Sequence, residues 1–225
     1  MGYFLLILSI ILYIYYLKSK NAKQIELPEE NPLYVYPEIK RINIANRKNK
    51  SICDEFIVID FETTGLNPYK NEIIEIAAVK FKNGYIIDEF VTLVKPINKI
   101  SREITKINNI TNSMVKDSPT IEKVFSDFIN FIGDNLLVMH NAKFDLGFLN
   151  CNIARLNLKV PPVINTLDTL SLSRKLLPKL KNHKLGTILN KLNIRNKNCH
   201  RAHGDAMATG QMLIIFLEML KKIKL

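Results

Sequence analysis

The sequence predicts an α/β fold with a mixed sheet, and three observations lead to this prediction. Residues 56–59, Phe-Ile-Val-Ile, form an apolar run rich in β-branched side chains, as in a strand buried on both faces. The pair Asn83-Gly84 joins two apolar stretches and is typical of a tight hairpin, so residues 73–82 and 85–94 are expected to be antiparallel strands. After Pro96, helical periods alternate with short apolar runs, which indicates alternating helices and strands.

The first 17 residues carry no charge, and Lys18, Lys20 and Lys23 follow them. At about 1.5 Å per residue, an apolar helix of this length reaches roughly 25 Å, the short end of a membrane span. The positive start and small-residue cleavage site of a signal peptide are not evident. We therefore predict an N-terminal apolar helix over residues 1–17 that anchors the chain, with the remainder on the cytoplasmic face of the membrane. The alternative is an apolar helix that packs on the domain or on a partner.

Residues 18–54 are rich in Lys, Asn, Glu and Pro and show no sustained periodicity, so we expect a basic tether. Residues 55–225 are expected to form one globular domain, because 47% hydrophobic residues suffice for a real core. The chain holds 32 Lys and Arg against 21 Asp and Glu, a net charge of +11 that favours polyanionic partners. Its three cysteines, odd in number and without CxxC spacing, indicate a reducing compartment and argue against a disulfide framework or a structural zinc site.

The elements after the hairpin follow from apolar spacing. Val124, Phe125, Phe128 and Ile132 share one face of a helix expected over 121–132. Short strands are expected at 136–139 and in the run that reaches Asp168. Further helices are expected near 101–107, 145–156, 169–177, 184–192 and 205–222.

Two carboxylates, Asp60 and Glu62, stand at the end of the first buried strand and precede a Thr-Thr-Gly turn. Side chains two residues apart on a strand share a face, so these two acids point the same way. Like charges held side by side are costly unless a cation neutralises them, and hard oxygen ligands suit Mg²⁺ or Mn²⁺. The alternative is a chance acid pair, since an Asp-x-Glu arises about once in a chain of this length at average composition.

In two later stretches of the chain, an apolar segment is likewise followed directly by ionisable residues. Asp145 follows the strand expected at 136–139, and Asp205 follows His200-Arg201-Ala202-His203-Gly204. Each acid alone has a simpler explanation, because an acidic residue at a helix start complements the helix dipole or caps the helix. The complete set of four acids, with a histidine five residues before the last, favours a shared metal site.

This set resembles the DEDDh group of 3′-to-5′ exonucleases, the DnaQ-like proofreading family, and is most similar to the exonuclease domain of Gram-positive replicative DNA polymerase III. The resemblance runs from about Phe56 to the C-terminus. Besides the acids, it rests on further ordered motifs, namely Glu62-Thr63-Thr64-Gly65-Leu66, Ile110-Thr111 before Met114-Val115, His140-Asn141-x-x-Phe144-Asp145, Asp168-Thr169-Leu170 and Asn182-His183-Lys184-Leu185. One departure is Asn109, where related sequences have Gly, and Asn tolerates the same left-handed turn.

The resemblance implies a ribonuclease H-like mixed five-stranded sheet flanked by helices and a reaction that uses two Mg²⁺ or Mn²⁺ ions. Asp60, Glu62 and Asp205 would hold one ion, and Asp60 and Asp145 the other. His200 would be the general base, because an imidazole titrates near neutrality. His203 is expected at the rim, His140 and His183 in packing or capping roles, and Asp168 as a possible helix cap.

The resemblance also implies that Thr63, Thr64, Leu66, Asn141 and Phe144 bind the terminal nucleotides. The expected partner is a single-stranded nucleic acid 3′ end, with DNA preferred over RNA, and the expected product is nucleoside monophosphate. A DNA polymerase is a further candidate partner. Alternatives are an exoribonuclease acting on short RNA, a catalytically silent nucleic-acid-binding module, or a chain whose apolar end and basic arm mainly recruit a partner.

Overall fold

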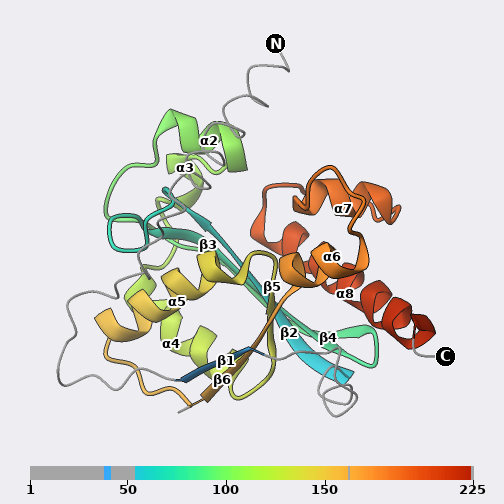
Figure 1. The fold of residues 1–225 in the computed structure, drawn as a ribbon. Helices are drawn as coiled ribbons and strands as arrows, with labels where there is room; N and C mark the ends of the chain where they lie inside the picture. The colour runs from blue at the N-terminus through green and yellow to red at the C-terminus, as the bar shows by residue number, and fades with distance from the viewer. Residues whose placement is uncertain (1–37, 42–53, 162, 224–225) are drawn as a thin grey trace, which may run out of the picture. The chain divides into compact units, whose positions relative to one another are not determined.

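The computed structural model describes residues 38–41, 54–161 and 163–223 (Figure 1). Their sheet has six strands in the order β1-β6-β5-β2-β3-β4. The pairs β2–β3 and β3–β4 are antiparallel, whereas β1–β6, β5–β6 and β2–β5 are parallel. The predicted mixed sheet is therefore confirmed.

The strands are β1 (Glu38–Arg41), β2 (Glu55–Thr63), β3 (Ile73–Lys82), β4 (Tyr85–Leu93), β5 (Leu137–Met139) and β6 (Val163–Asp168). The helices are α2 (Arg102–Asn108), α3 (Asn112–Val115), α4 (Ile121–Ile132), α5 (Ala142–Arg155), α6 (Thr169–Leu176), α7 (Leu185–Lys191) and α8 (Ala202–Ile223). The β3–β4 hairpin confirms the Asn83-Gly84 prediction, because both turn residues have positive φ. Helix α4 has the predicted bounds.

The sheet has one strand more than the five expected. Strand β1 lies within the segment expected to be a tether and pairs in parallel with β6. It has four residues and only one apolar side chain, Ile39, so it carries no alternating pattern that a sequence analysis could detect. Its pairing satisfies the backbone groups of β6, which would otherwise be a sheet edge.

Each face of the sheet packs on its own set of helices. On β2, Phe56 and Val58 belong to one core cluster with residues of α8, while Ile57 and Ile59 belong to the other with residues of α4 and α5. Figure 1 shows α4 and α5 on one side of the sheet and α6, α7 and α8 on the other. Successive side chains of β2 point to opposite faces of the sheet, so this one strand contributes to both hydrophobic cores.

No helix within the described ranges is both long and apolar enough to cross a bilayer. The anchor predicted for residues 1–17 and most of the predicted tether lie outside the described residues.

Candidate active site

Strand β2 carries two of the predicted acids on the face that packs against α8. Phe56 and Val58 point into the core beneath α8, and the period of two continues that row with Asp60 and Glu62. The apolar part of the row lies under the helix, whereas the two acids lie where the strand passes beyond the apolar packing. The shared face predicted for Asp60 and Glu62 is thus the face of the sheet that α8 covers.

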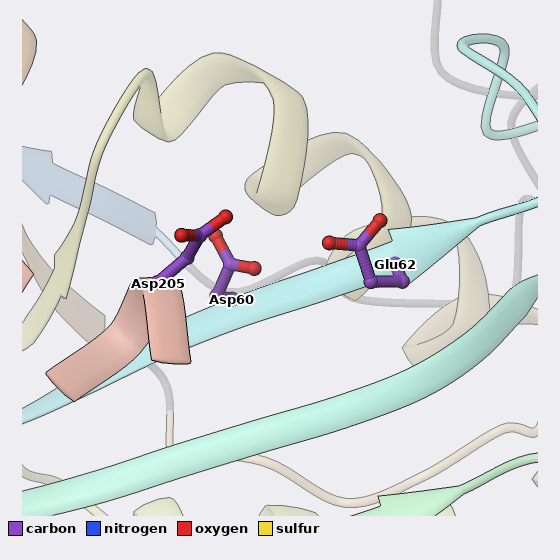
Figure 2. Close-up of side chains that lie close together, drawn as sticks. All are labelled: Asp60, Glu62 and Asp205. Atoms are coloured by element: carbon purple, nitrogen blue, oxygen red, sulfur yellow. The ribbon is translucent and has the colours of Figure 1, made fainter. Parts of the chain in front are cut away.

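Helix α8 brings the third acid to this face. At Gly210 an added Cβ would lie 2.2 Å from Cζ of Phe81 on β3, so the absence of a side chain lets the helix approach the sheet closely. Asp205 is in the first turn of α8. One ligand oxygen each from Asp60, Glu62 and Asp205 lie within 4.8 Å of one another. Figure 2 shows the three carboxylates converging from β2 and the start of α8.

The loop before α8 folds back onto Asp205. The side-chain amide of Asn196 donates to Oδ1 of Asp205, and the backbone N–H of His200 donates to Oδ2 at 3.3 Å. Gly204 makes this close approach possible, because a Cβ there would lie 2.5 Å from the carbonyl oxygen of Asn198. His200 itself is exposed and has φ of +61°. A non-glycine residue in this left-handed region is strained, and such strain is frequent at functional sites.

An ion pair between buried Glu75 and half-buried Arg201, beside the acids, was not predicted from the sequence. Glu75 on β3 lies opposite Glu62 on β2 and is only 2% exposed. Nε of Arg201 donates to both Glu75 carboxylate oxygens, and the N–H of Ala202 donates to Glu75 Oε2 at 2.9 Å. Glu75 therefore caps the start of α8 from across the sheet. The available signal was a single acid within the apolar run Ile73–Val79 and an arginine directly after His200.

Asp145 lies in the first turn of α5 and is 3% exposed. It is not one of the three clustered acids, but its charge is the largest electrostatic contribution, after burial, to the raised pKa of Asp60. Its Oδ1 atom is buried and has no hydrogen-bond partner among the described residues. Such an unpaired buried oxygen is costly and indicates a missing cationic or donor partner.

Asp168 organises the start of α5 as well as that of α6. Its Oδ1 accepts from the N–H groups of Leu170 and Asn141, each at 3.0 Å, so the cap predicted at Asp168 is confirmed. The contact with Asn141 also explains why α5 begins at Ala142, three residues before the expected start. The half-buried ring of His140 forms hydrogen bonds with Thr169 and with the carbonyl oxygen of His183, which confirms its predicted structural role.

The predicted nucleotide-binding residues lie at the end of β2, in the turn that follows it, and at the start of α5. In the turn after β2, the Thr63 hydroxyl donates to the carbonyl oxygen of Gly65 at 2.6 Å. The Thr64 hydroxyl accepts from the N–H of Glu72, so its own hydrogen can still be donated to a ligand. Leu66 is 58% exposed. Asn141 has φ of +74° and precedes α5, and Phe144 is half-buried with its ring 5.1 Å from that of Phe148.

Two further sequence expectations can be compared with the structure. Asn109 has φ of +59° and ends α2, so the turn expected to survive the departure from Gly is present. Nε2 of His203 lies 3.2 Å from Glu89 on β4 without hydrogen-bond geometry, away from the three clustered carboxylates. His203 thus has the peripheral place expected of it.

The acids raise one another's pKa. Burial raises the pKa of Glu62 to about 8, and the Asp205 charge adds to this while a hydrogen bond from Asn108 opposes it. Burial raises the pKa of Asp60 well above its usual range, with further contributions from Asp145 and Glu62. Burial likewise raises the pKa of Asp145 and of Asp205. These directions mean that the folded chain holds acids that favour protonation or a bound cation.

The residues fit divalent cations. Three carboxylates supply a compact set of hard oxygen ligands, and the unpaired Oδ1 of Asp145 supplies a fourth buried oxygen that lacks a partner. This acid cluster is consistent with the two divalent ions that the sequence resemblance implies.

We expect the metal-free protein to lose stability as pH rises. Unfolding returns Glu62 from a pKa of about 8 to its ordinary value near 4.5, so between these values the folded state binds more protons. Stability is therefore highest at the acidic end of this window and falls toward pH 8, by up to about 5 kcal/mol at about 1.4 kcal/mol per pKa unit. Thermal unfolding in EDTA measures this slope. Glu62→Gln should flatten it, and saturating Mn²⁺ should restore stability at pH 8. A slope of the opposite sign would contradict the prediction.

A family model described as Exonuclease (RNase_T) matches residues 57–213. A DNA polymerase III PolC-type from Caldanaerobacter subterraneus subsp. tengcongensis is 44% identical over 180 residues, which cover 80% of this chain and 13% of that protein. The corresponding protein of Halalkalibacterium halodurans is 48% identical over 161 residues, covering 71% of this chain and 11% of that protein. The chain thus spans about an eighth of the length of these curated relatives.

Solved structures share the fold. Exonuclease X, solved in complex with 5′ overhanging duplex DNA, is 28% identical with a TM-score of 0.58, covering 76% of this chain and 93% of that one. E. coli Exonuclease I, solved with a dT13 oligonucleotide, has a TM-score of 0.66 at 18% identity, covering 76% of this chain and 42% of that one. With the family model covering most of the domain, the chain belongs to this exonuclease family and is a nucleic-acid hydrolase of the DEDD group.

Proposed function

We propose that the chain removes nucleoside monophosphates stepwise from the 3′ end of single-stranded DNA, with two Mg²⁺ or Mn²⁺ ions. The observation that carries this proposal is the convergence of Asp60, Glu62 and Asp205 within 4.8 Å, beside a buried Asp145 oxygen that lacks a partner. In this proposal Asp60, Glu62 and Asp205 hold one cation, and Asp60 and Asp145 hold the other. Two bound cations would supply Lewis-acid stabilisation of the attacking and leaving oxygens of a phosphodiester.

The chain's own residues orient the substrate and move the proton. Exposed Leu66 stands at the end of the Thr63–Gly65 turn and is proposed to wedge against the last bases. Thr63 and Thr64 are proposed to meet the terminal nucleotide through this turn, and Asn141 and Phe144 through the start of α5. His200 is proposed to accept the proton of the attacking water, because its loop is bonded to Asp205 and its exposed ring can reach solvent.

We expect His200→Ala to lower turnover by about 10²–10⁴-fold, the range of a lost general base, with little change in nucleic-acid binding. Asp205 still keeps its Asn196 contact in this variant. Single-turnover rates across pH measure the effect, since loss of the base should also remove one limb of the pH profile. His203→Ala is the matched control because His203 contacts Glu89 instead. Equal rates for wild type and His200→Ala would assign the base to another group.

The direct experiment uses the full chain and 5′-labelled strands of matched DNA and RNA sequence. We expect a ladder that shortens from the 3′ end, faster on DNA, and no ladder in excess EDTA. Retained cleavage in EDTA would contradict the metal requirement. Faster decay of RNA would favour the exoribonuclease alternative, and binding without cleavage in Mn²⁺ would favour a silent binding module.

The setting of this activity is also proposed. The curated relatives named above are DNA polymerases that contain a matching segment, which supports a role beside a replicative polymerase. The uncharged run of residues 1–17 and the lysines after it support attachment to the cytoplasmic face of a membrane. Fractionation tests the second point: release of the full-length chain from membranes by salt or carbonate alone would rule out a spanning anchor.

A further inference from the structure

The positive charge of the domain is concentrated in one segment. Residues 169–204 contain nine Lys and Arg and neither Asp nor Glu, whereas residues 55–168 contain twelve basic and fourteen acidic residues. Outside this segment the domain is therefore close to neutral. An isolated surface lysine is common and carries no functional meaning. Here, however, 36 consecutive residues have a net charge of +9, and their positive charges repel one another and attract a polyanion.

This segment borders the acidic site at both of its ends. It begins directly after Asp168, which binds the N–H of Asn141, and it ends at the first turn of α8, which holds Asp205. Between these ends it forms α6, α7 and the loop that carries Asn196, whose side chain bonds Asp205. Figure 1 shows α6 and α7 beside α8, on one side of the sheet.

Most of the cations of the segment are exposed to solvent, where a ligand can reach them. Seven of them are exposed, and no ion pair among the described residues uses their side chains; they are Arg174, Lys175, Lys179, Lys181, Lys191, Arg195 and Lys197. Lys80 and Lys82 on β3 differ from them, because both bind Glu55. The segment is also free of Phe, Tyr and Trp, so it offers no platform on which bases could stack.

We propose that residues 169–204 form a cationic track for the backbone phosphates of the strand that lies 5′ to the terminal nucleotide. The inference rests on the proposed exonuclease function. It adds that the enzyme binds not only the terminal nucleotide but also a longer stretch of the strand on its 5′ side. A track of lysine and arginine without aromatic side chains recognises phosphate spacing and charge but not base identity. Binding should therefore depend on strand length and on salt, and be nearly independent of base composition.

The test compares short and long substrates in the full chain. The variant Lys175→Gln, Lys179→Gln, Lys181→Gln should raise KM for a long single strand while leaving KM and kcat for a strand of a few nucleotides unchanged. Each lost phosphate contact on a single strand lowers the slope of log K against log salt by about 0.7, so the slope for the long strand should fall by about 2. Poly-dT and poly-dC strands should respond alike.

The control variant carries Lys123→Gln, Lys159→Gln and Lys222→Gln, three exposed lysines outside the track. It removes the same charge and should leave the long-strand KM and salt slope close to wild type. Equal effects of the two variants, or no effect of either, would overturn the track while leaving the exonuclease function in place. A matching loss on the short substrate would place these lysines at the terminal nucleotide and would also overturn it.

A membrane surface is the competing polyanion. Vesicles rich in phosphatidylserine, mixed with the full chain, should bind the track variant and the control variant equally. Selective loss of vesicle binding by the track variant, with unchanged long-strand KM, would assign the segment to lipid headgroups instead. Failure of the wild type on short and long strands alike would refute the exonuclease proposal itself, and that outcome is distinct from all of these.

Discussion

Asp60→Asn is expected to reduce turnover by about a thousandfold or more. Asp60 is the acid that both proposed cations share, and it lies among Glu62, Asp205 and Asp145. Metal ions supply several kcal/mol of transition-state stabilisation, and about 1.4 kcal/mol corresponds to a factor of ten in rate. Asparagine keeps the size of the side chain and removes only the charge, so the packing beneath α8 should not change. Single-turnover cleavage of a 5′-labelled strand in Mn²⁺ measures the effect.

The same substitution should stabilise the metal-free protein. Burial and four neighbouring acids raise the pKa of Asp60, so its ionised form is unfavourable in the folded state without a cation. A higher melting temperature in EDTA together with lost activity would therefore distinguish a lost ligand from a lost fold. The matched control is Asp134→Asn, an exposed acid in the turn after α4, which should change neither property. Near-normal turnover of Asp60→Asn would contradict the proposed metal site.

Arg201→Met is expected to destabilise the domain by about 3 kcal/mol, the lower end of the range for breaking a buried ion pair. Methionine keeps much of the apolar stem but leaves the Glu75 carboxylate, 2% exposed, with only the N–H of Ala202. Turnover should also fall by about 10–100-fold, as for groups that orient metal ligands, because the pair holds the start of α8 and with it Asp205. Urea unfolding and single-turnover rates measure the two effects.

A second substitution separates charge from packing. Glu75→Gln in the Arg201→Met background removes the uncompensated buried charge, so most of the lost stability should return. Turnover should stay low, because the bridge from β3 to the start of α8 is still missing. Arg102→Met, at the exposed start of α2, is the control and should be neutral. A double variant no more stable than Arg201→Met would show that the pair does not act through charge.

The cluster of acids also explains why this part of the fold needs positive charges, from Arg201 and from bound cations, to be stable. Asp60, Glu62 and Asp205 repel one another, and Glu75 adds a fourth negative charge nearby. Arg201 offsets part of this repulsion by lowering the pKa of Glu62, although burial of Glu62 outweighs it. A fold that binds cations at such a cluster gives up stability in their absence, which is a common cost of a functional site.

Local patterns in the sequence determined the elements of this protein. The apolar run of β2, the Asn83-Gly84 turn and the apolar face of α4 each act over a few residues, so their prediction succeeded. Strand β1 was missed because its four residues have no pattern of their own and depend on the edge of β6. The start of α5 was misplaced because Asp168, 27 residues away, binds the N–H of Asn141.

Sequence alone also placed Asp60 and Glu62 on one face, since the period of a strand is fixed by its backbone. Only the tertiary structure decided which acids meet there. The close packing of α8 on Phe81, permitted by Gly210, brings Asp205 to that face, and the Glu75–Arg201 pair holds it. Asp145 approaches from α5 and stays outside the group of three. Distances between residues far apart in the chain depend on how helices pack and strands register, and no local pattern encodes them.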